Sequence, residues 1–254
     1  MKEEFRQRLL AGERLIGTVV TMAHAPIAEL LSSAGFDWLF VDGEHGCLSS
    51  GDIQQILQAA QPRCPCVVRV ATADEVYVKQ ALDLGADGII VPLVNDAAAA
   101  ARVAAWAKYP PLGNRSVGIA RAHGYGDRFA DYVAQANDRV AVIVQVEHVD
   151  AVANIEAILD VDPVDAVFVG PYDLSASMGK PGRVQDADVR QQIDVVRQAC
   201  LRRKKTLGIF GADAAAVQPF LNQGYTLIAA AMDTLLLSQS ARALLSALDA
   251  DPRR

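Results

Sequence analysis

The sequence contains few cysteines, and their spacing excludes the common cysteine-based sites. Four of the 254 residues are cysteine, at positions 47, 64, 66 and 200. Cys64 and Cys66 are separated by one proline, which is closer than the C-x-x-C spacing of metal and redox motifs, and no second pair occurs elsewhere. We therefore expect reduced, structural thiols in a cytoplasmic protein.

Long apolar runs are absent as well. A membrane-spanning helix needs about 20 apolar residues, and Arg102 and Lys108 interrupt the region that follows the alanine run 97–101. The amino-terminal residues mix charged and apolar side chains and lack the apolar core and cleavage site of a signal peptide. These absences predict a protein that has no membrane partner.

Excess positive charge and a flexible linker are also missing. The 30 Asp and Glu outnumber the 24 Lys and Arg, and the net charge of −6 argues against a nucleic-acid partner. Hydrophobic residues make up 52% and charged residues 21%, which excludes a disordered chain. No Ser/Gly/Pro-rich stretch divides the sequence, so we expect a single domain over residues 1–254.

Short apolar runs of strand length recur along the chain, and each is followed by a helical pattern. The runs are continuously apolar rather than alternating, as in parallel strands that are buried on both faces. Capping signals, such as Thr72 with Glu75 and an aspartate at 213, mark the starts of helices between them. The eight predicted strands are 15–22, 38–42, 66–70, 88–94, 140–146, 166–170, 206–210 and 226–232.

Eight strand–helix units in about 250 residues predict a (β/α)8 TIM barrel, in the α/β class. The alternative is an open, doubly wound sheet. Such a sheet usually has a glycine-rich phosphate turn after its first strand, and residues 20–24 contain no glycine. In a barrel, chemistry takes place at the carboxyl ends of the strands, so polar residues should gather there.

Charged and polar residues do follow the apolar runs. The second run ends in Asp42-Gly43-Glu44-His45, and Arg69 lies near the end of the third. The fifth ends in Gln145-Val146-Glu147, and the sixth is followed by Gly170-Pro171-Tyr172-Asp173. A charge beside a buried strand is costly unless it has a partner or a metal, so these positions are the candidate site.

Glu147 and Asp173 end consecutive strands and should lie side by side. Two neighbouring carboxylates repel each other unless they share a proton or bind a cation. Oxygen ligands without a Cys or His set favour Mg²⁺ or Mn²⁺. The alternative is that one carboxylate pairs with Arg69 or caps the next helix.

His45 is the candidate general acid or base, because histidine titrates near neutral pH and Asp42 is near enough in the chain to orient it. Arg69 could stabilise negative charge on a substrate oxygen, or it could simply anchor Glu44 or Asp42. The irregular segment 109–137 resembles a loop at a barrel mouth, where Arg115 and Arg121 would either meet an anionic substrate or be solvated.

The motifs at these positions resemble those of the HpcH/HpaI aldolase family, the metal-dependent class II pyruvate aldolases of the 4-hydroxy-2-oxoheptanedioate aldolase type. The resemblance runs from the first helix to about residue 240. Its most specific parts are F-D-W…D-G-E-H and G-P-x-D-L-S in this order and spacing. The matching stretches are 34–38, 41–45, 67–69, 91–94, 109–118, 145–147 and 169–175.

The resemblance implies a barrel with an exchanged carboxyl-terminal helix, in a homo-oligomer that is a hexamer or a trimer. It also implies Mg²⁺, Mn²⁺ or Co²⁺ and no organic cofactor. The implied metal ligands are Glu147 and Asp173; the implied catalytic residues are His45, Asp42 and Arg69; the implied substrate-binding residues are Gln145, Gly170, Pro171, Tyr172 and Arg121. Tyr172 stands where close relatives can carry a smaller residue, which leaves the pocket for the aldehyde open.

The implied reaction is the reversible cleavage of a 4-hydroxy-2-oxo acid to pyruvate and an aldehyde through a metal-bound pyruvate enolate. No lysine lies at a strand end where it could form a Schiff base, which also favours the metal route. The alternative is a related lyase or decarboxylase that acts on oxaloacetate or a CoA thioester. A phosphate-binding barrel or a non-catalytic assembly protein would show no metal-dependent cleavage.

Overall fold

The computed structural model describes residues 4–61 and 63–249. Eight parallel strands form a closed barrel in which each strand pairs with the next and β8 pairs with β1. This confirms the predicted barrel, and each predicted strand lies within three residues of the observed one. The strands are β1 Leu15–Val20, β2 Trp38–Asp42, β3 Cys66–Arg69, β4 Gly88–Val91, β5 Ala141–Val146, β6 Ala166–Val169, β7 Thr206–Gly211 and β8 Leu227–Met232.

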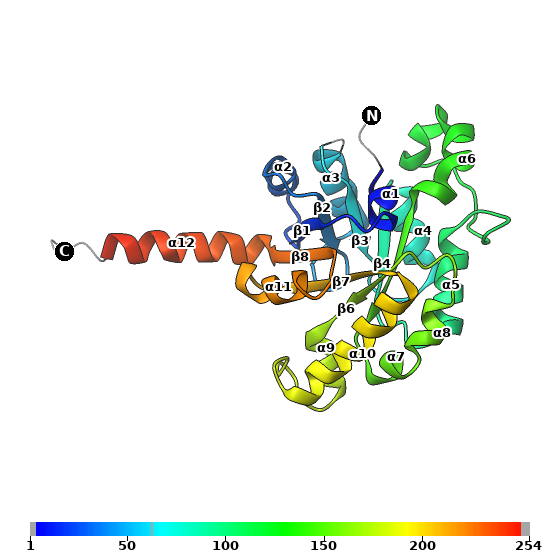
Figure 1. The fold of residues 1–254 in the computed structure, drawn as a ribbon. Coiled ribbons are helices and arrows are strands. Elements are labelled where there is room, and N and C mark those ends of the chain that lie inside the picture. The colour runs from blue at the N-terminus through cyan, green and yellow to red at the C-terminus, as the bar shows by residue number, and fades with distance from the viewer. Residues whose placement is uncertain (1–3, 62, 250–254) are drawn as a thin grey trace.

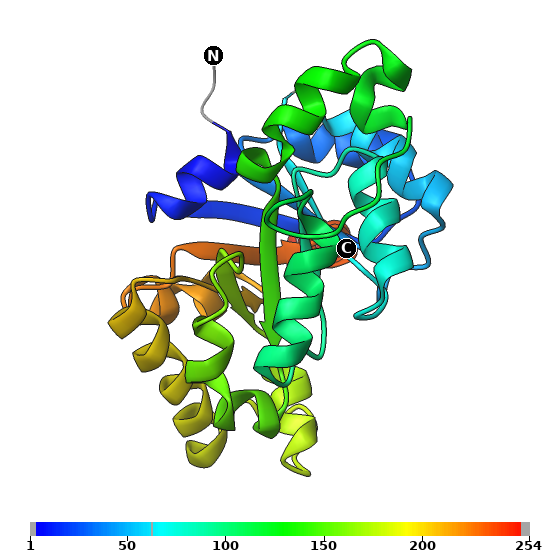
Figure 2. The same ribbon diagram turned by 90° about the vertical axis from the view of Figure 1, so that its right-hand side faces the viewer.

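Helices surround the strands (Figures 1 and 2). Helix α1 precedes the first strand, and the others lie in the connections between strands or after the last one. They are α1 Phe5–Leu10, α2 Ala25–Ser33, α3 Ser50–Ala60, α4 Glu75–Asp83, α5 Ala97–Ala107, α6 Phe129–Arg139, α7 Val149–Ala153, α8 Ile155–Leu159, α9 Pro171–Ser177, α10 Ala187–Arg203, α11 Ala214–Leu221 and α12 Asp233–Asp249, with a 3-10 helix η1 at Arg121–Gly126.

Side chains cap several of these helices. The predicted aspartate at 213 caps α11 and accepts a hydrogen bond from the amide of Ala216. The predicted capping box of Thr72 and Glu75 is wrong, because Asp74 caps α4 and accepts from the amide of Val76. Asp74 is two residues nearer the helix than Thr72 and therefore reaches the amides of its first turn.

The inside of the barrel is filled from its amino end. Trp38, Phe40 and Phe168 pack together with ring centroids 5.6 to 6.5 Å apart, and Phe5 of α1 closes the end against Trp38. A second apolar layer lies between the outer faces of the strands and the helices. Because the interior is packed, a site along the barrel axis has room only at the carboxyl ends of the strands.

Helix α12 extends away from the barrel instead of packing along its side (Figure 1). Its leucines at 237, 244, 245 and 248 are exposed. The exchange of this helix with a second copy, implied by the family resemblance, stays a prediction. No helix in residues 4–61 and 63–249 is long and apolar enough to cross a membrane.

The irregular segment 109–137 lies at the amino ends of the strands, so the prediction of a loop at the barrel mouth is wrong. It follows α5 and precedes β5, and a helix-to-strand connection returns the chain to the amino end. Arg115 is buried between the rings of Tyr109 and Tyr132, 4.7 and 5.6 Å from their centroids, and pairs with Asp83 at 2.7 Å. Arg115 therefore holds this segment together and does not meet a substrate at the mouth.

The sequence also contains a basic run at the end of α10. Arg202 and Arg203 of this run pair with Glu156, and Arg203 also pairs with Asp160. Two of the four cations of residues 202–205 are therefore compensated by α8 and the residue that follows it. The expectation of no nucleic-acid partner stays a prediction.

Candidate active site

A cavity of about 430 Å³ opens at the carboxyl ends of the strands, and most of the predicted site residues line it. Alternation along the strands explains this gathering. Trp38 and Phe40 point into the barrel, so Asp42 does as well, and Val67 is followed in the same way by Arg69. The predicted residues that line the cavity are Asp42, His45, Arg69, Gln145, Gly170, Pro171, Tyr172 and Asp173.

Asp42 and Arg69 form a buried, two-point ion pair. The register of β2 and β3 places the two residues opposite each other. Nε and a terminal nitrogen of Arg69 donate to the two oxygens of Asp42 at 2.9 and 2.7 Å. Burial alone would raise the pKa of Asp42, but the hydrogen bonds and charge of Arg69 outweigh it and lower that pKa. Both groups therefore stay charged.

Glu44 is the second partner of Arg69. Its carboxylate lies 3.0 Å from the other terminal nitrogen of the guanidinium. Burial raises the pKa of Glu44, and the positive charge of Arg69 opposes the increase. Arg69 thus holds two carboxylates and serves as an anchor at the wall of the cavity, as one sequence interpretation expected.

His45 lies at the rim, and its side chain is 63% exposed. Asp42 accepts a hydrogen bond from the backbone amide of His45 at 3.1 Å, whereas the carboxylate of Glu44 lies 3.9 Å from Nε2 of the His45 ring. The expectation that Asp42 orients the imidazole is therefore wrong in detail. Asp42 fixes the backbone of the turn, because its oxygens are occupied by Arg69 and by main-chain amides.

Glu147 is buried just beyond the end of β5, with an exposure of 3%. One oxygen accepts from the amide of Leu93 at 2.8 Å, and the other accepts from the side-chain nitrogen of Gln145. Burial raises the pKa of Glu147; the two hydrogen bonds oppose the increase, whereas the charges of Glu44 and Asp173 add to it. Gln145 is also buried, and its oxygen has no hydrogen-bond partner among the described residues.

Gly170 permits the close approach of β6 to Glu147. A Cβ atom at this position would lie 2.8 Å from the Glu147 carboxylate and 3.1 Å from the Gln145 amide. The Gly170 amide donates to Val146 within the barrel at 3.1 Å. Pro171 has no N–H, so Tyr172 and Asp173 supply the free amides of the first turn of α9.

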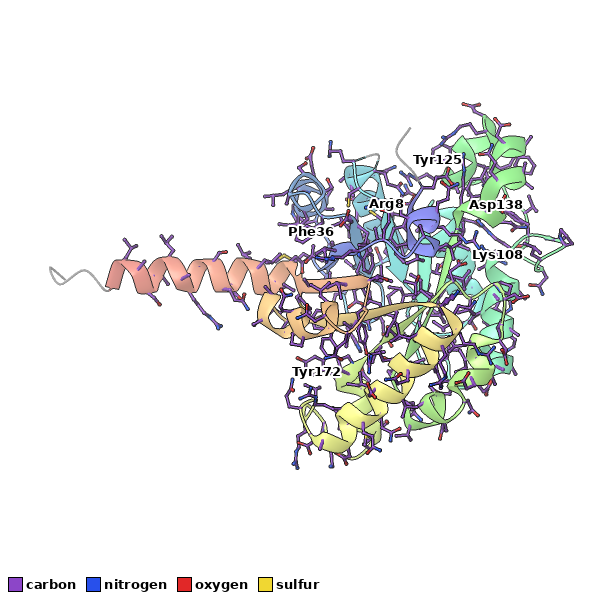
Figure 3. The ribbon with its side chains drawn as sticks, in the orientation of Figure 1. Arg8, Phe36, Lys108, Tyr125, Asp138 and Tyr172 are labelled. Carbon is purple, nitrogen blue, oxygen red and sulfur yellow. The ribbon has the colours of Figure 1, made fainter. Side chains whose placement is uncertain are left out.

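Asp173 and Tyr172 lie at the open side of the cavity. Both are exposed, and the ring of Tyr172 lies 6.4 Å from that of Phe210. Figure 3 shows Tyr172 on the side of the molecule away from Arg8 and Tyr125. Among the described residues, the carboxylate of Asp173 makes no hydrogen bond or ion pair.

The donor set at this cavity suits a hard divalent cation. Besides burial, the charge of Asp173 raises the pKa of Glu147. Gln145, whose oxygen is unpartnered, donates to Glu147 and lines the same cavity as Asp173. Within residues 4–61 and 63–249 no cluster of three His, Cys, Asp or Glu forms a ready-made metal site. Two carboxylates would leave the remaining positions of an octahedral ion to water and substrate, which is how Mg²⁺ is commonly held.

Arg121 does not join the site, so its predicted place beside the substrate is wrong for this chain. It donates to the carbonyl of Leu84 at 2.6 Å and to the side chain of Gln61 at 3.1 Å. It lines a separate cavity with Phe5 and Gly85 at the amino end of the barrel. Arg121 lies at the amino end because the whole segment 109–137 does: this segment leads from helix α5 to the start of strand β5.

Some residues that the fold places at the site have no role in the sequence analysis. Glu44 is not one of them, because one interpretation of Arg69 already makes Glu44 an ion-pair partner, and the structure contains this pair. Phe210, one residue before the end of β7, and Met232, the last residue of β8, line the cavity. Asp233 follows and accepts hydrogen bonds from the amide and hydroxyl of Thr21 at 2.8 and 2.7 Å, which fixes the loop after β1. A search for polar residues after all eight strands, rather than after four of them, would have found Asp233, which follows β8.

Comparison with known proteins gives matches over nearly the whole chain. The family model for HpcH/HpaI aldolase/citrate lyase matches residues 16–240. A 4-hydroxy-2-oxo-heptane-1,7-dioate aldolase of Salmonella paratyphi B is 39% identical over 259 aligned positions, which cover 100% of this chain and 97% of the relative.

Solved structures agree with these matches. An HpcH/HpaI aldolase/citrate lyase family protein from Burkholderia cenocepacia J2315 superposes with a TM-score of 0.93 at 35% identity, covering 96% of this chain and 98% of the other. A citrate lyase beta subunit from M. tuberculosis, complexed with oxaloacetate and magnesium, has a TM-score of 0.59 at 14% identity, covers 90% of this chain and 95% of the other, and shares the fold alone.

Proposed function

Because the chain belongs to the HpcH/HpaI aldolase/citrate lyase family, we propose that it cleaves a 4-hydroxy-2-oxo acid reversibly to pyruvate and an aldehyde with the help of a divalent cation. The relatives make it a carbon–carbon lyase of the aldolase type. The observation that carries the proposed reaction is one cavity that contains Asp173 and Arg69 and lies beside the buried Glu147. The substrate, the cation and the residue roles are the proposal.

Glu147 and Asp173 would hold Mg²⁺, Mn²⁺ or Co²⁺, which would supply a Lewis acid for the keto oxygen of the substrate. Gln145 supports this site from two sides. Its nitrogen fixes one Glu147 oxygen, and its free oxygen accepts a hydrogen bond from a water or from the substrate. Gly170 keeps the space open that Glu147 needs.

Arg69 stabilises the negative charge that develops on the keto oxygen as the bond between C3 and C4 breaks. Two of the five N–H groups of the guanidinium are used by hydrogen bonds to Asp42. Glu44 adds an ion pair at 3.0 Å, and three N–H groups remain for the substrate. The two carboxylates keep the group fixed before the reaction, and a fixed donor is more effective than a mobile one.

His45 removes the proton of the C4 hydroxyl, directly or through a water molecule, and returns a proton to the enolate. Its ring is exposed at the rim of the cavity, where it can reach the substrate and exchange protons with solvent. Asp42 assists by holding the turn that carries the ring. The amides of Tyr172 and Asp173 bind the substrate carboxylate, and Pro171 sets the start of their helix.

We further propose that the active form is a homo-oligomer, a hexamer or a trimer, formed by exchange of α12. The support is the exposed leucines on a helix that leaves its own barrel. The chain would then act as one barrel domain in the cytoplasm, on pyruvate and an aldehyde as its small-molecule partners.

A retro-aldol assay tests the proposal. The purified protein is incubated with a panel of 4-hydroxy-2-oxo acids, with and without EDTA, and pyruvate release is measured. We expect EDTA to abolish release and Mg²⁺, Mn²⁺ or Co²⁺ to restore it. Undiminished release in metal-free buffer would contradict the role of the cation. Decarboxylation of oxaloacetate without cleavage of any panel member would favour the alternative reaction.

A further inference from the structure

The two proposed metal ligands are held in different ways. Both carboxylate oxygens of Glu147 accept a hydrogen bond, one from the amide of Leu93 and the other from the side chain of Gln145. The carboxylate of Asp173, in contrast, has no hydrogen bond or ion pair to any of the described residues. Because no neighbouring group fixes it, the place of this carboxylate depends on how firmly the main chain at Asp173 is held.

Ser175 holds that main chain. It lies in α9, two residues after Asp173, and it has no exposed surface. Its hydroxyl donates a hydrogen bond to the carbonyl of Tyr172 at 2.6 Å. This carbonyl belongs to the planar peptide group that also contains the nitrogen of Asp173. A fixed carbonyl therefore fixes the orientation of the Asp173 amide and the direction in which the chain enters Asp173.

The hydroxyl of Ser175 is itself held by the connection between α9 and α10 (Figure 1). The amide of Gly182 donates to this hydroxyl at 3.1 Å, and the amide of Lys180 donates to the main-chain carbonyl of Ser175 at 2.8 Å. A hydroxyl has one proton and two acceptor lone pairs. Since the Gly182 amide occupies a lone pair, the single proton is directed to the carbonyl of Tyr172.

The connection, which we call the 178–186 loop, is shaped to fold back on α9. Gly179 and Gly182 have φ angles of +74° and +79°, which side chains other than glycine rarely adopt. An ion pair between Lys180 and Asp186, at 3.3 Å, joins the two sides of the loop. The position of the Gly182 amide over Ser175 is therefore set by the fold of the loop.

The loop also lies beside the catalytic cavity. Val184 and Gln185, near its end, line a second cavity of about 480 Å³. This second cavity shares Tyr172 and Phe210 with the catalytic cavity. The 178–186 loop and the proposed metal site are thus neighbours in space as well as being linked through Ser175.

We propose that Ser175 is a positioning residue for Asp173 and that it couples the 178–186 loop to metal binding. The inference rests on the proposed role of Asp173 as a metal ligand and adds the group and the segment that hold this ligand in place. Without the hydroxyl, the carbonyl of Tyr172 and the amide of Gly182 lose their partner, and the cation meets a less ordered carboxylate. The coupling is reciprocal: if the attached loop favours metal binding, bound metal favours the attached loop.

Calorimetric titration with Mn²⁺ compares the wild type with Ser175→Ala. We expect the variant to bind Mn²⁺ roughly fivefold more weakly, which corresponds to one hydrogen bond. Ser32→Ala is the matched control, because the hydroxyl of Ser32 also donates to a carbonyl three residues earlier, that of Glu29 at 2.8 Å, and accepts from Arg63 at 3.3 Å. Ser32 is buried in the last turn of α2, where the chain returns to the amino ends of the strands. The control should lose a similar amount of stability in urea and bind Mn²⁺ like the wild type.

Limited proteolysis tests the coupling without a variant. Trypsin cleaves after arginine, and Arg183 of the loop is exposed. We expect saturating Mn²⁺ to slow cleavage after Arg183 in the wild type roughly fivefold, the factor that reciprocity requires. Cleavage after Arg128, an exposed residue beside the cavity at the amino end, is the reference and should not respond to Mn²⁺. In Ser175→Ala, cleavage after Arg183 should be faster than in the wild type, and Mn²⁺ should no longer slow it.

The positioning role and the aldolase proposal fail in different ways. If the wild type binds Mn²⁺ and releases pyruvate but Ser175→Ala binds Mn²⁺ as well as Ser32→Ala does, the positioning role is overturned and the aldolase proposal stands. Wild-type cleavage after Arg183 that does not respond to Mn²⁺ overturns the role too, also when Ser175→Ala does not fold. A wild type that binds no Mn²⁺ contradicts both. The expected Mn²⁺ results without pyruvate release contradict the aldol reaction alone.

Discussion

A methyl group added at Gly170 tests how tightly the fold positions the proposed metal ligand. In Gly170→Ala the new Cβ would lie 2.8 Å from a Glu147 oxygen and 2.9 Å from the Glu147 Cβ, whereas ordinary contacts begin at 3.4 Å. The φ of Gly170 is −98°, which alanine adopts without strain. The whole effect must therefore come from crowding, and Glu147 has to move by about 0.6 Å.

The expected magnitude follows from this displacement. Overpacking of a buried site costs about 1–3 kcal/mol of unfolding free energy. The same movement pulls Glu147 away from the amide of Leu93 and from Gln145. A functional group has to be held within about 0.5 Å of its productive place, so we expect pyruvate release to fall roughly tenfold to a hundredfold and Mn²⁺ affinity to fall with it.

The assay combines calorimetric titration with Mn²⁺, pyruvate release at saturating Mn²⁺ and denaturant unfolding. Gly118→Ala is the matched control, because a Cβ there has no atom within 4 Å. The control should equal the wild type in all three measurements. If Gly170→Ala binds Mn²⁺ and turns over like the control, the reasoning that the Gly170 cradle fixes Glu147 is refuted.

Three further substitutions have distinct expected outcomes. His45→Ala should lower kcat by at least roughly a hundredfold, as for a lost general base, while Mn²⁺ affinity in the titration stays unchanged. Glu147→Gln should weaken Mn²⁺ binding at least about tenfold without unfolding the protein, because Gln145 can turn its unpartnered oxygen toward the new amide. Lys108 is 1% exposed, and burial lowers its pKa from 10.5 to about 8. Since the unfolded chain then holds the proton more tightly, this residue makes stability rise with pH from about 8 to 10.5, by at most about 3 kcal/mol. Lys108→Met should flatten that rise in urea unfolding.

Each of these outcomes can fail. Unchanged kcat would remove His45 from the reaction, and unchanged Mn²⁺ affinity would mean that Glu147 is not a ligand. Parallel pH curves for wild type and Lys108→Met would show that the two carbonyl acceptors of Lys108, at 2.8 and 2.7 Å, already offset its burial. The Met variant also loses those two hydrogen bonds, so the slope with pH, rather than the absolute stability, is the quantity to compare.

Much of the barrel could be predicted because its pattern is local. A buried parallel strand is a short apolar run, and β2 was predicted at its observed bounds, Trp38–Asp42. The site residues at the strand ends could be found for the same reason. A charge at the end of such a run has to be explained by function or by an ion pair; Asp42 and Arg69 form an ion pair, and both line the cavity of the proposed site.

The predictions that were wrong concern residues whose positions depend on the direction in which the chain runs through the barrel. Segment 109–137 has the composition of a binding loop, but it connects α5 to β5 and so lies at the amino end with Arg121 and Arg115. The order of elements alone could have shown this. The order of elements could not show which carboxylate lies near the His45 ring, because Asp42 and Glu44 are both close to His45 in the sequence. The two-point ion pair with Arg69 decides this, since it occupies Asp42 and leaves Glu44 nearer the ring.

The sequence by itself determined that eight apolar runs would pair and that polar groups would gather at their carboxyl ends, because hydrophobic burial and strand periodicity are set by neighbouring residues. Only the tertiary structure decided which of these groups meet. Closure of the barrel fixed the register of β2 against β3, and with it the partners of Arg69. Packing also brought the rings of Tyr172 and Phe210, from separate strand ends, to the boundary between two cavities. Contacts between residues far apart in the chain depend on the whole barrel being formed, and no local pattern specifies them.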